Sequence, residues 1–213
     1  MSLTERVIEA SAQLMERLGL PGLFAVSAAE LLLAPIPGEA VMALAGFLAS
    51  RGVFGLHETI LVGSLGNLAG SLIEYFLGLH LARPALLRLG KYLLISEGDL
   101  TLAEEFFRSK NGFAAVFVGR MIPGIRSVIG FPAGIARMNP LSFALATITG
   151  SLPWNALFAC LGYLLGERWQ VVLAYSNLVD AVGVLALLAA AAYLLARIRA
   201  SGRSLFGTRT RGA

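Results

Sequence analysis

Four charged side chains stand in stretches of sequence that are otherwise almost entirely apolar: Glu30, Glu39, Arg120 and Arg126. A guanidinium group can hold a phosphate through two parallel hydrogen bonds, and a carboxyl group removed from water takes up a proton more readily. The acids lie in the first half of the chain and the bases in the second, so contact between the halves would neutralise them as pairs. This set predicts either a structural ionic clamp or a site that binds a phosphate at the arginines and a proton at Glu39, with Glu30 in support.

The composition shows what surrounds these charges. Of the 213 residues, 57% are hydrophobic and 14% are charged, against roughly 45–50% and about 25% in soluble domains. A chain of this size cannot hide such an excess in one core, so the sequence predicts a membrane protein. A lone charge at the centre of a bilayer costs at least about 2.5–3.5 kcal/mol, which favours contact among the four side chains.

Composition also disfavours several functions. The net charge of +4 comes from dispersed basic residues and not from a basic stripe, so nucleic-acid binding is not expected. Cys160 is the only cysteine, which excludes an intrachain disulfide. His57 and His80 are isolated, and no cluster has metal-ligand spacing, so we expect neither a metal nor another cofactor. The N-terminus lacks the apolar core of a signal peptide, and we expect no cleavage.

The apolar segments are of two kinds. Segments 23–49 and 113–136 are interrupted, at residues 34–38 and at Pro123-Gly124, so each part reaches only about half of a 30 Å hydrocarbon core. Each is predicted to be a re-entrant helical hairpin, which requires protein or water around the break. The uninterrupted segments are long enough for full spans: 59–81, 143–165 and 171–196.

Two further segments are amphipathic. Residues 1–20 and 82–111 mix charged with large apolar side chains, as in helices that lie in the membrane interface, and Pro21 and Gly22 should end the first. The predicted fold is an all-α integral membrane protein with a single membrane domain. Its parts are an interfacial helix 1–20, a first repeat 21–81, a connector 82–111, a second repeat 112–166, a final transmembrane helix 167–196 and a basic tail 197–213.

The two halves resemble each other in sequence. Three pairs of motifs match at offsets of 86 to 88 residues: Ile36-Pro37-Gly38 with Ile122-Pro123-Gly124, Gly63-Ser64-Leu65 and Asn67 with Gly150-Ser151-Leu152 and Asn155, and Ala45-Gly46 with Ala133-Gly134. A hairpin returns to its own side of the membrane and a span crosses it, so the second copy starts from the opposite face. The pattern predicts an inverted repeat, in which transporters bind substrate near the midplane.

The basic residues that flank the spans predict the orientation. With the C-terminus inside, eleven Lys and Arg residues lie on the inner side and four on the outer side. The tail, Arg83, Arg108 and Arg137 are therefore expected in the cytoplasm, and Arg51 outside.

The second break resembles the signature of a known family. The motifs are Gly119-Arg120-Met121-Ile122-Pro123-Gly124-Ile125-Arg126-Ser127, then Ala133-Gly134, Gly150 and Trp154. They resemble those of the DedA family, bacterial relatives of the eukaryotic proteins with a VTT domain. In the first half, Pro37-Gly38-Glu39 resembles the family's Pro-Gly-acid motif, and Glu30 lies where the family has an acid.

This resemblance implies a transporter, flippase or scramblase of phosphate-bearing lipids in the bacterial inner membrane, with undecaprenyl phosphate or glycerophospholipids as substrates and protons as coupling ions in some members. It also implies that the four charges named first are the functional ones. The sequence departs from the family at Leu79-His80, where an arginine is common. Glu74 is a secondary site candidate or a partner for His80, and Asp180 is a further secondary candidate.

Other functions remain open. A proton-coupled transporter of a small anionic solute would use the same charges, and a non-transporting membrane assembly factor would move nothing in liposomes. A lipid phosphatase would need a nucleophile with an acid or base, but the two histidines lie near the ends of spans. The chain is therefore not expected to be an enzyme.

Overall fold

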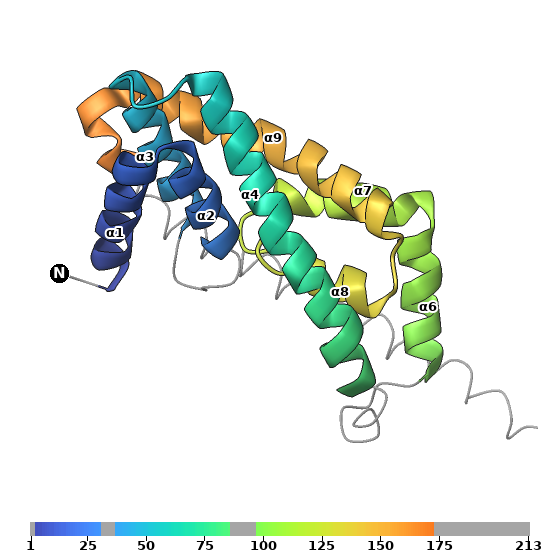
Figure 1. Ribbon diagram of the computed structural model, residues 1–213. Coiled ribbons are helices and arrows are strands. Elements are labelled where there is room, and N and C mark those ends of the chain that lie inside the picture. The colour runs from blue at the N-terminus through green and yellow to red at the C-terminus, as the bar shows by residue number, and fades with distance from the viewer. Residues whose placement is uncertain (1–2, 31–36, 86–96, 173–213) are drawn as a thin grey trace, which may run out of the picture.

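The computed structural model describes residues 3–30, 37–85 and 97–172, and every regular element within these ranges is helical (Figure 1). This confirms the all-α class. The elements are α1 (Leu3–Leu18), α2 (Leu20–Glu30), α3 (Gly38–Ser50), α4 (Leu56–Leu77), the π-helical turn η1 (Gly78–Ala82), α6 (Glu97–Arg108), α7 (Lys110–Arg120), α8 (Gly130–Ile135), α9 (Pro140–Leu165) and the 3-10 turn η2 (Gly166–Arg168).

The boundary between α1 and α2 differs from the prediction. α1 ends at Leu18, and Gly19 takes a left-handed conformation with φ of 63°. Pro21 and Gly22, which were expected to end the helix, lie instead in the first turn of α2. Proline is tolerated there because the first N–H groups of a helix have no intrahelical partner. Gly22 allows close contact, since a Cβ at this position would collide with the backbone of Leu14.

Two helical segments are long and apolar enough to cross a membrane: Leu56–Ala85, which comprises α4 and its extension, and Pro140–Arg168, which comprises α9 and η2. They contain the predicted spans 59–81 and 143–165. Pro153 lies inside α9 without ending it. The predicted last span from residue 173 onward, Asp180 within it and the basic tail lie outside the described residues.

Short helices flank each predicted break. α2 and α3 lie on either side of residues 31–36, which are outside the described part of the chain. α7 and α8 are joined by the turn-rich segment 121–129, in which Gly124 has a left-handed φ of 74°. Glycine adopts this conformation without the steric penalty of a Cβ atom.

The helices of the two halves exchange partners. α2 packs on α4 and α7 packs on α9, each within its own half, whereas α3 packs on α9 and α8 packs on α4. Glycines make the exchanged contacts possible: a Cβ at Gly46 would collide with the backbone of Ala159, and a Cβ at Gly134 with the backbone of Tyr75. Because Gly46 and Gly134 occupy matching places in the sequence repeat, the exchange follows the repeat.

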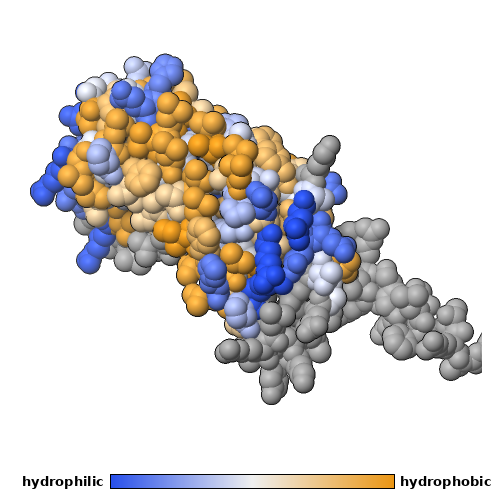
Figure 2. Space-filling model, turned by 45° about the vertical axis from the view of Figure 1, so that its right-hand side comes forward, coloured by the Kyte–Doolittle hydropathy of each residue, from blue (hydrophilic) through white to orange (hydrophobic). Residues whose placement is uncertain are grey.

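The surface is apolar over much of its area. Figure 2 shows apolar side chains across the middle of one face and hydrophilic side chains toward its ends. Exposed large apolar residues project from both long helices, among them Leu61, Leu65, Ile73, Leu145, Leu157 and Leu164. Such a surface fits a lipid environment, because soluble proteins rarely expose large contiguous apolar patches.

Candidate functional site

The guanidinium of Arg126 lies between two carboxylates from the other half of the chain. Its Nη2 is 3.1 Å from Oε1 of Glu30, and its Nη1 is 3.3 Å from Oε1 of Glu39. All three side chains are at most 4% exposed. The buried guanidinium thus lowers the desolvation penalty of both acids, while its single positive charge balances one of the two negative charges.

Two of the three residues lie at helix ends, and the third lies in the turn segment 121–129. Glu30 is the last residue of α2, Glu39 is in the first turn of α3, and Arg126 lies in the segment between α7 and α8. Gly38 lets them meet, since a Cβ there would fall on the carboxylate of Glu30 and lie 2.8 Å from Nη1 of Arg126. The breaks in the apolar segments therefore bring the charged residues together.

Arg120 has a different set of partners from the one expected. It is the last residue of α7 and 1% exposed, and it donates hydrogen bonds to the backbone carbonyl of Arg126, at 2.7 Å, and to the hydroxyl of Ser71. The neutralisation of four charges as separate pairs is therefore not what the structure shows: Arg126 contacts both acids, while Arg120 holds the loop that carries Arg126. We call Glu30, Glu39, Arg120 and Arg126 the central site.

α9 supplies the other wall of the central site. The guanidinium carbon of Arg126 lies 5.5 Å from the centre of the Trp154 ring, within the range of a cation–π contact. Gly150, one turn earlier, lets α7 approach, because a Cβ there would lie 2.9 Å from Cβ of Arg120. The sequence analysis named Trp154 only as part of the family motif and did not predict its contact with the arginine.

A polar network connects the two long helices beside Glu30. Nδ2 of Asn155 donates to Oδ1 of Asn67 and to the hydroxyl of Ser64, both at 3.0 Å. Asn67 in turn donates to the carbonyl of Ser27 at 3.1 Å and lies 3.5 Å from Oε2 of Glu30. Asn67 and Asn155 occupy matching positions in the sequence repeat, and this duplication was the signal that could have assigned them to the site.

Glu74 is the fifth buried charged side chain of the described chain. Its side chain is fully buried, Arg120 interacts with it electrostatically, and neither carboxylate oxygen has a hydrogen-bond partner among the described residues. It does not pair with His80, which is exposed and stacks on Phe76 at 6.1 Å between ring centres. The three buried acids and two buried bases carry one net negative charge when all are ionised, whereas the four expected residues alone would be neutral.

The arrangement suits an anion and protons better than a metal ion. The described residues contain no group of three His, Cys, Asp or Glu side chains that could hold a metal. They do contain two buried guanidinium groups, which offer planar hydrogen-bond donors to a phosphate or a carboxylate.

The described part of the chain is all-helical, with an apolar surface and a buried charged site where the two similar halves meet, and this defines the class of helical membrane proteins with an internal polar site. The VTT domain family matches residues 36–164, more than half of the chain. The chain belongs to this family, which confirms the resemblance to the DedA proteins and the assignment to the membrane.

Several bacterial proteins are similar to a large part of this chain. The membrane protein YkoX of Bacillus subtilis is 44% identical over 137 residues, which cover 64% of this chain and 62% of YkoX. Undecaprenyl phosphate transporter A of the same organism is 39% identical over 64% of this chain and 69% of its own length. An alkaline phosphatase-like protein of Lactococcus lactis is 36% identical over 83% of this chain and 87% of its own length. No solved structure matches the chain.

Proposed function

We propose that this protein moves a phosphate-bearing lipid, with a polyprenyl phosphate as the first candidate, across the bacterial inner membrane. The observation that carries the proposal is the buried guanidinium of Arg126 held between Glu30 and Glu39 of the other half. A similar protein is named an undecaprenyl phosphate transporter, and a phosphate group matches the planar fork of hydrogen-bond donors that a guanidinium offers. We propose transport and not an enzymatic activity.

We further propose that each half forms a re-entrant hairpin and a span, and that the two halves are inverted in the membrane. The exchange of α3 and α8 between the long helices supports this arrangement, because a two-fold relation between the halves would produce the same exchange in both. The break of each hairpin would then lie at the depth of the central site. A single membrane domain with an interfacial first helix and an inner C-terminal tail completes this proposal.

The charges suggest how a phosphate would bind. An arriving phosphate competes with Glu30 and Glu39 for the donors of Arg126. Arg120 would hold the loop in place and offer its own guanidinium to the same phosphate. A displaced carboxylate in a poorly solvated site then loses its partner and takes up a proton.

Proton uptake follows from the charge count. The buried side chains already carry one formal negative charge in excess when Glu74 is included, and a phosphate adds further negative charge. Binding of protons relieves this imbalance, so proton and phosphate binding should be positively linked. We propose that Glu39 carries the proton, with Glu30 in support and Glu74 and Asp180 as secondary candidates.

Reconstitution into liposomes tests this function. Purified protein is inserted into vesicles that contain labelled undecaprenyl phosphate or labelled phosphatidylcholine, and the appearance of label in the other leaflet is measured with and without a pH gradient. We expect movement of the polyprenyl phosphate that Arg126→Gln abolishes and that Arg51→Gln, a change of an exposed arginine, leaves intact. Equal rates in the Arg126→Gln protein and the unmodified protein would contradict the proposal. Movement of no lipid at all would favour the assembly factor.

A further inference from the structure

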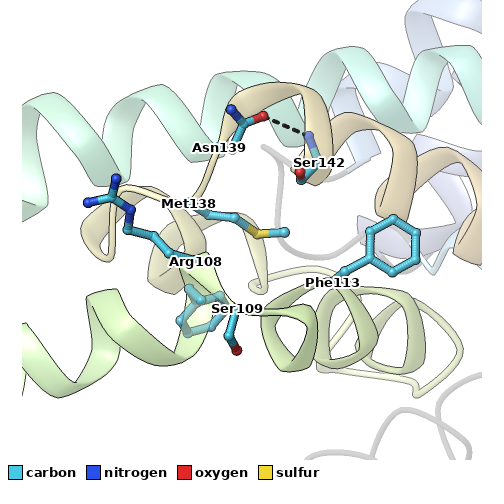
Figure 3. Close-up of a pocket in the computed structure, with 7 residues that line it drawn as sticks. Arg108, Ser109, Phe113, Met138, Asn139 and Ser142 are labelled. Carbon is cyan, nitrogen blue, oxygen red and sulfur yellow. Dashed lines mark hydrogen bonds between the residues drawn. The ribbon is translucent and has the colours of Figure 1, made fainter.

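A second basic region lies where α6 meets α7 and α9 begins. Two cavities of about 470 and 400 Å³ open here and share Arg108, Met138 and Asn139 in their walls. Figure 3 shows the larger one, with Arg108 and Phe113 on opposite sides of Met138. None of the four residues of the central site lines either cavity. The region is therefore separate from the central site.

Two positive charges in these walls have no neutralising partner within the part of the chain that the structure describes. Arg108 lines both cavities and Arg137 lines the smaller one, and both side chains are exposed. Neither has an ion-pair or hydrogen-bond partner among the residues that the structure describes. Arg83, at the same end of the molecule, contrasts with them, because it pairs with Glu104 and donates to the carbonyl of Ile135. Arg108 and Arg137 therefore offer two guanidinium groups that no described acid pairs with.

The backbone at Arg137 is better suited to glycine. Arg137 has a left-handed φ of 51°, the amide of Met138 donates to the carbonyl of Ala133, and the amide of Arg137 donates to that of Gly134, both at 3.0 Å. These bonds form the Schellman motif that closes α8, in which the left-handed position is usually glycine. A side chain at this position costs energy that glycine would avoid. The backbone conformation therefore does not explain an arginine at position 137. A role for its positive charge beside the cavity would explain it.

The other walls are mostly apolar. Phe107, Phe113 and Met138 line the larger cavity, and Tyr75 and Leu79 line the smaller. The start of α9 does not supply free donors, because Oδ1 of Asn139 already accepts hydrogen bonds from the amides of residues 141 and 142. Two guanidinium groups above apolar walls match an amphipathic ligand with an anionic head. A free anion would leave the apolar walls unfilled.

We propose that these adjoining cavities form a docking site for the phosphate headgroup of a membrane lipid, in which Arg108 and Arg137 contact the phosphate and the apolar walls contact the adjoining part of the lipid. The region is expected at the inner membrane surface from the distribution of basic residues. The inference rests on the proposed function only for the class of lipid. It adds a second, peripheral site to the central one.

A tryptophan in the wall can report on occupancy. Phe113→Trp, in a protein that also carries Trp154→Phe and Trp169→Phe, places the only indole of the protein in the larger cavity. The protein is placed in phosphatidylcholine nanodiscs, and quenching is compared for phosphatidic acid and phosphatidylcholine brominated at the same acyl carbons. We expect phosphatidic acid to quench at a lower mole fraction, because its headgroup bears net negative charge and contacts the two arginines.

Variants then test the two arginines. We expect Arg108→Gln and Arg137→Gly each to weaken the preference for phosphatidic acid about fivefold, and Arg51→Gln, at the other end of the molecule, to leave it unchanged. Arg137→Gly removes the charge and relieves the backbone, so its melting temperature should be maintained or raised. A lost preference together with maintained stability assigns the effect to binding. An unchanged preference in the double variant, or equal quenching by both lipids, would overturn the proposal, as would displacement of the lipid by millimolar inorganic phosphate.

Measurements of undecaprenyl phosphate transport in liposomes separate this inference from the proposed function. Failure of undecaprenyl phosphate transport with the preference at position 113 intact would reject the proposed function and leave the docking site. Transport that persists without any preference at position 113 would reject the docking site alone.

Discussion

Arg126 forms salt bridges with both Glu30 and Glu39, so substitutions of these three residues should differ in their cost to stability. Arg126→Gln leaves Glu30 and Glu39 buried without their guanidinium, whereas Glu39→Gln leaves Arg126 still 3.1 Å from Glu30. Breaking a buried pair costs about 3–5 kcal/mol when a charge remains uncompensated. We therefore expect Arg126→Gln to lower the free energy of unfolding by about 3–5 kcal/mol, and Glu39→Gln by less.

The two changes should also couple. In the double variant, residue 39 is already uncharged when the guanidinium is lost. The total cost should therefore fall below the sum of the two single costs by about 0.5–3 kcal/mol, the range found for residues in direct contact. This is a double-mutant cycle. Unfolding in mixed micelles at fixed pH, followed by circular dichroism, measures the free energy of unfolding of the unmodified protein, the two single variants and the double variant. A control cycle combines Arg126→Gln with Glu58→Gln, an exposed residue at the start of α4, and should be additive.

Strict additivity of Arg126→Gln and Glu39→Gln would refute the reasoning, since two side chains in a buried ion pair cannot respond independently. A cost for Glu39→Gln that equals or exceeds that of Arg126→Gln would show that Arg126 is not shared between the two acids.

Three further predictions follow from the same geometry. Gly38→Ala should destabilise the protein by at least about 1–3 kcal/mol, the cost of forcing extra volume into a packed core, because the added methyl group would fall on the carboxylate of Glu30. Thermal unfolding measures this effect, and an unchanged melting temperature would contradict the close approach of Glu30 to Gly38. Affinity for a phosphate lipid should weaken as the pH rises, because protons and phosphate bind together, and this dependence should largely disappear in Glu39→Gln, whose amide imitates the protonated acid; a full pH dependence in that variant would place the proton on another acid. Cysteines introduced at Arg51 and Arg108 in a cysteine-free protein should react with an impermeant reagent from opposite faces of the membrane, and labelling from one face would exclude the proposed inverted repeat.

Local patterns in the sequence predicted most of the helices of the described chain. Composition and the lengths of the apolar segments predicted an all-helical membrane protein, and the helical segments Leu56–Ala85 and Pro140–Arg168 contain the two predicted spans 59–81 and 143–165. Pro123-Gly124 marked a break that the structure has, since helix geometry depends on residues a few positions apart. The error at Pro21 has the same origin: a proline both ends a helix and begins one, and only the conformation of Gly19 decided between them.

The sequence could predict that charged residues of the two halves meet, but not which residues pair. The sequence determined that two acids and two bases lie in apolar segments and that their charges must be compensated. The tertiary structure decided that Arg126 takes both acids, that Arg120 turns to Ser71 and a backbone carbonyl, and that Glu74 joins them without a hydrogen-bond partner in the described chain. Ser71 and Arg120 are 49 residues apart, and Glu30 and Arg126 are 96 residues apart. Which of them meet depends on how closely the helices cross, and that distance is set by glycines whose partner surfaces lie in the other half of the chain.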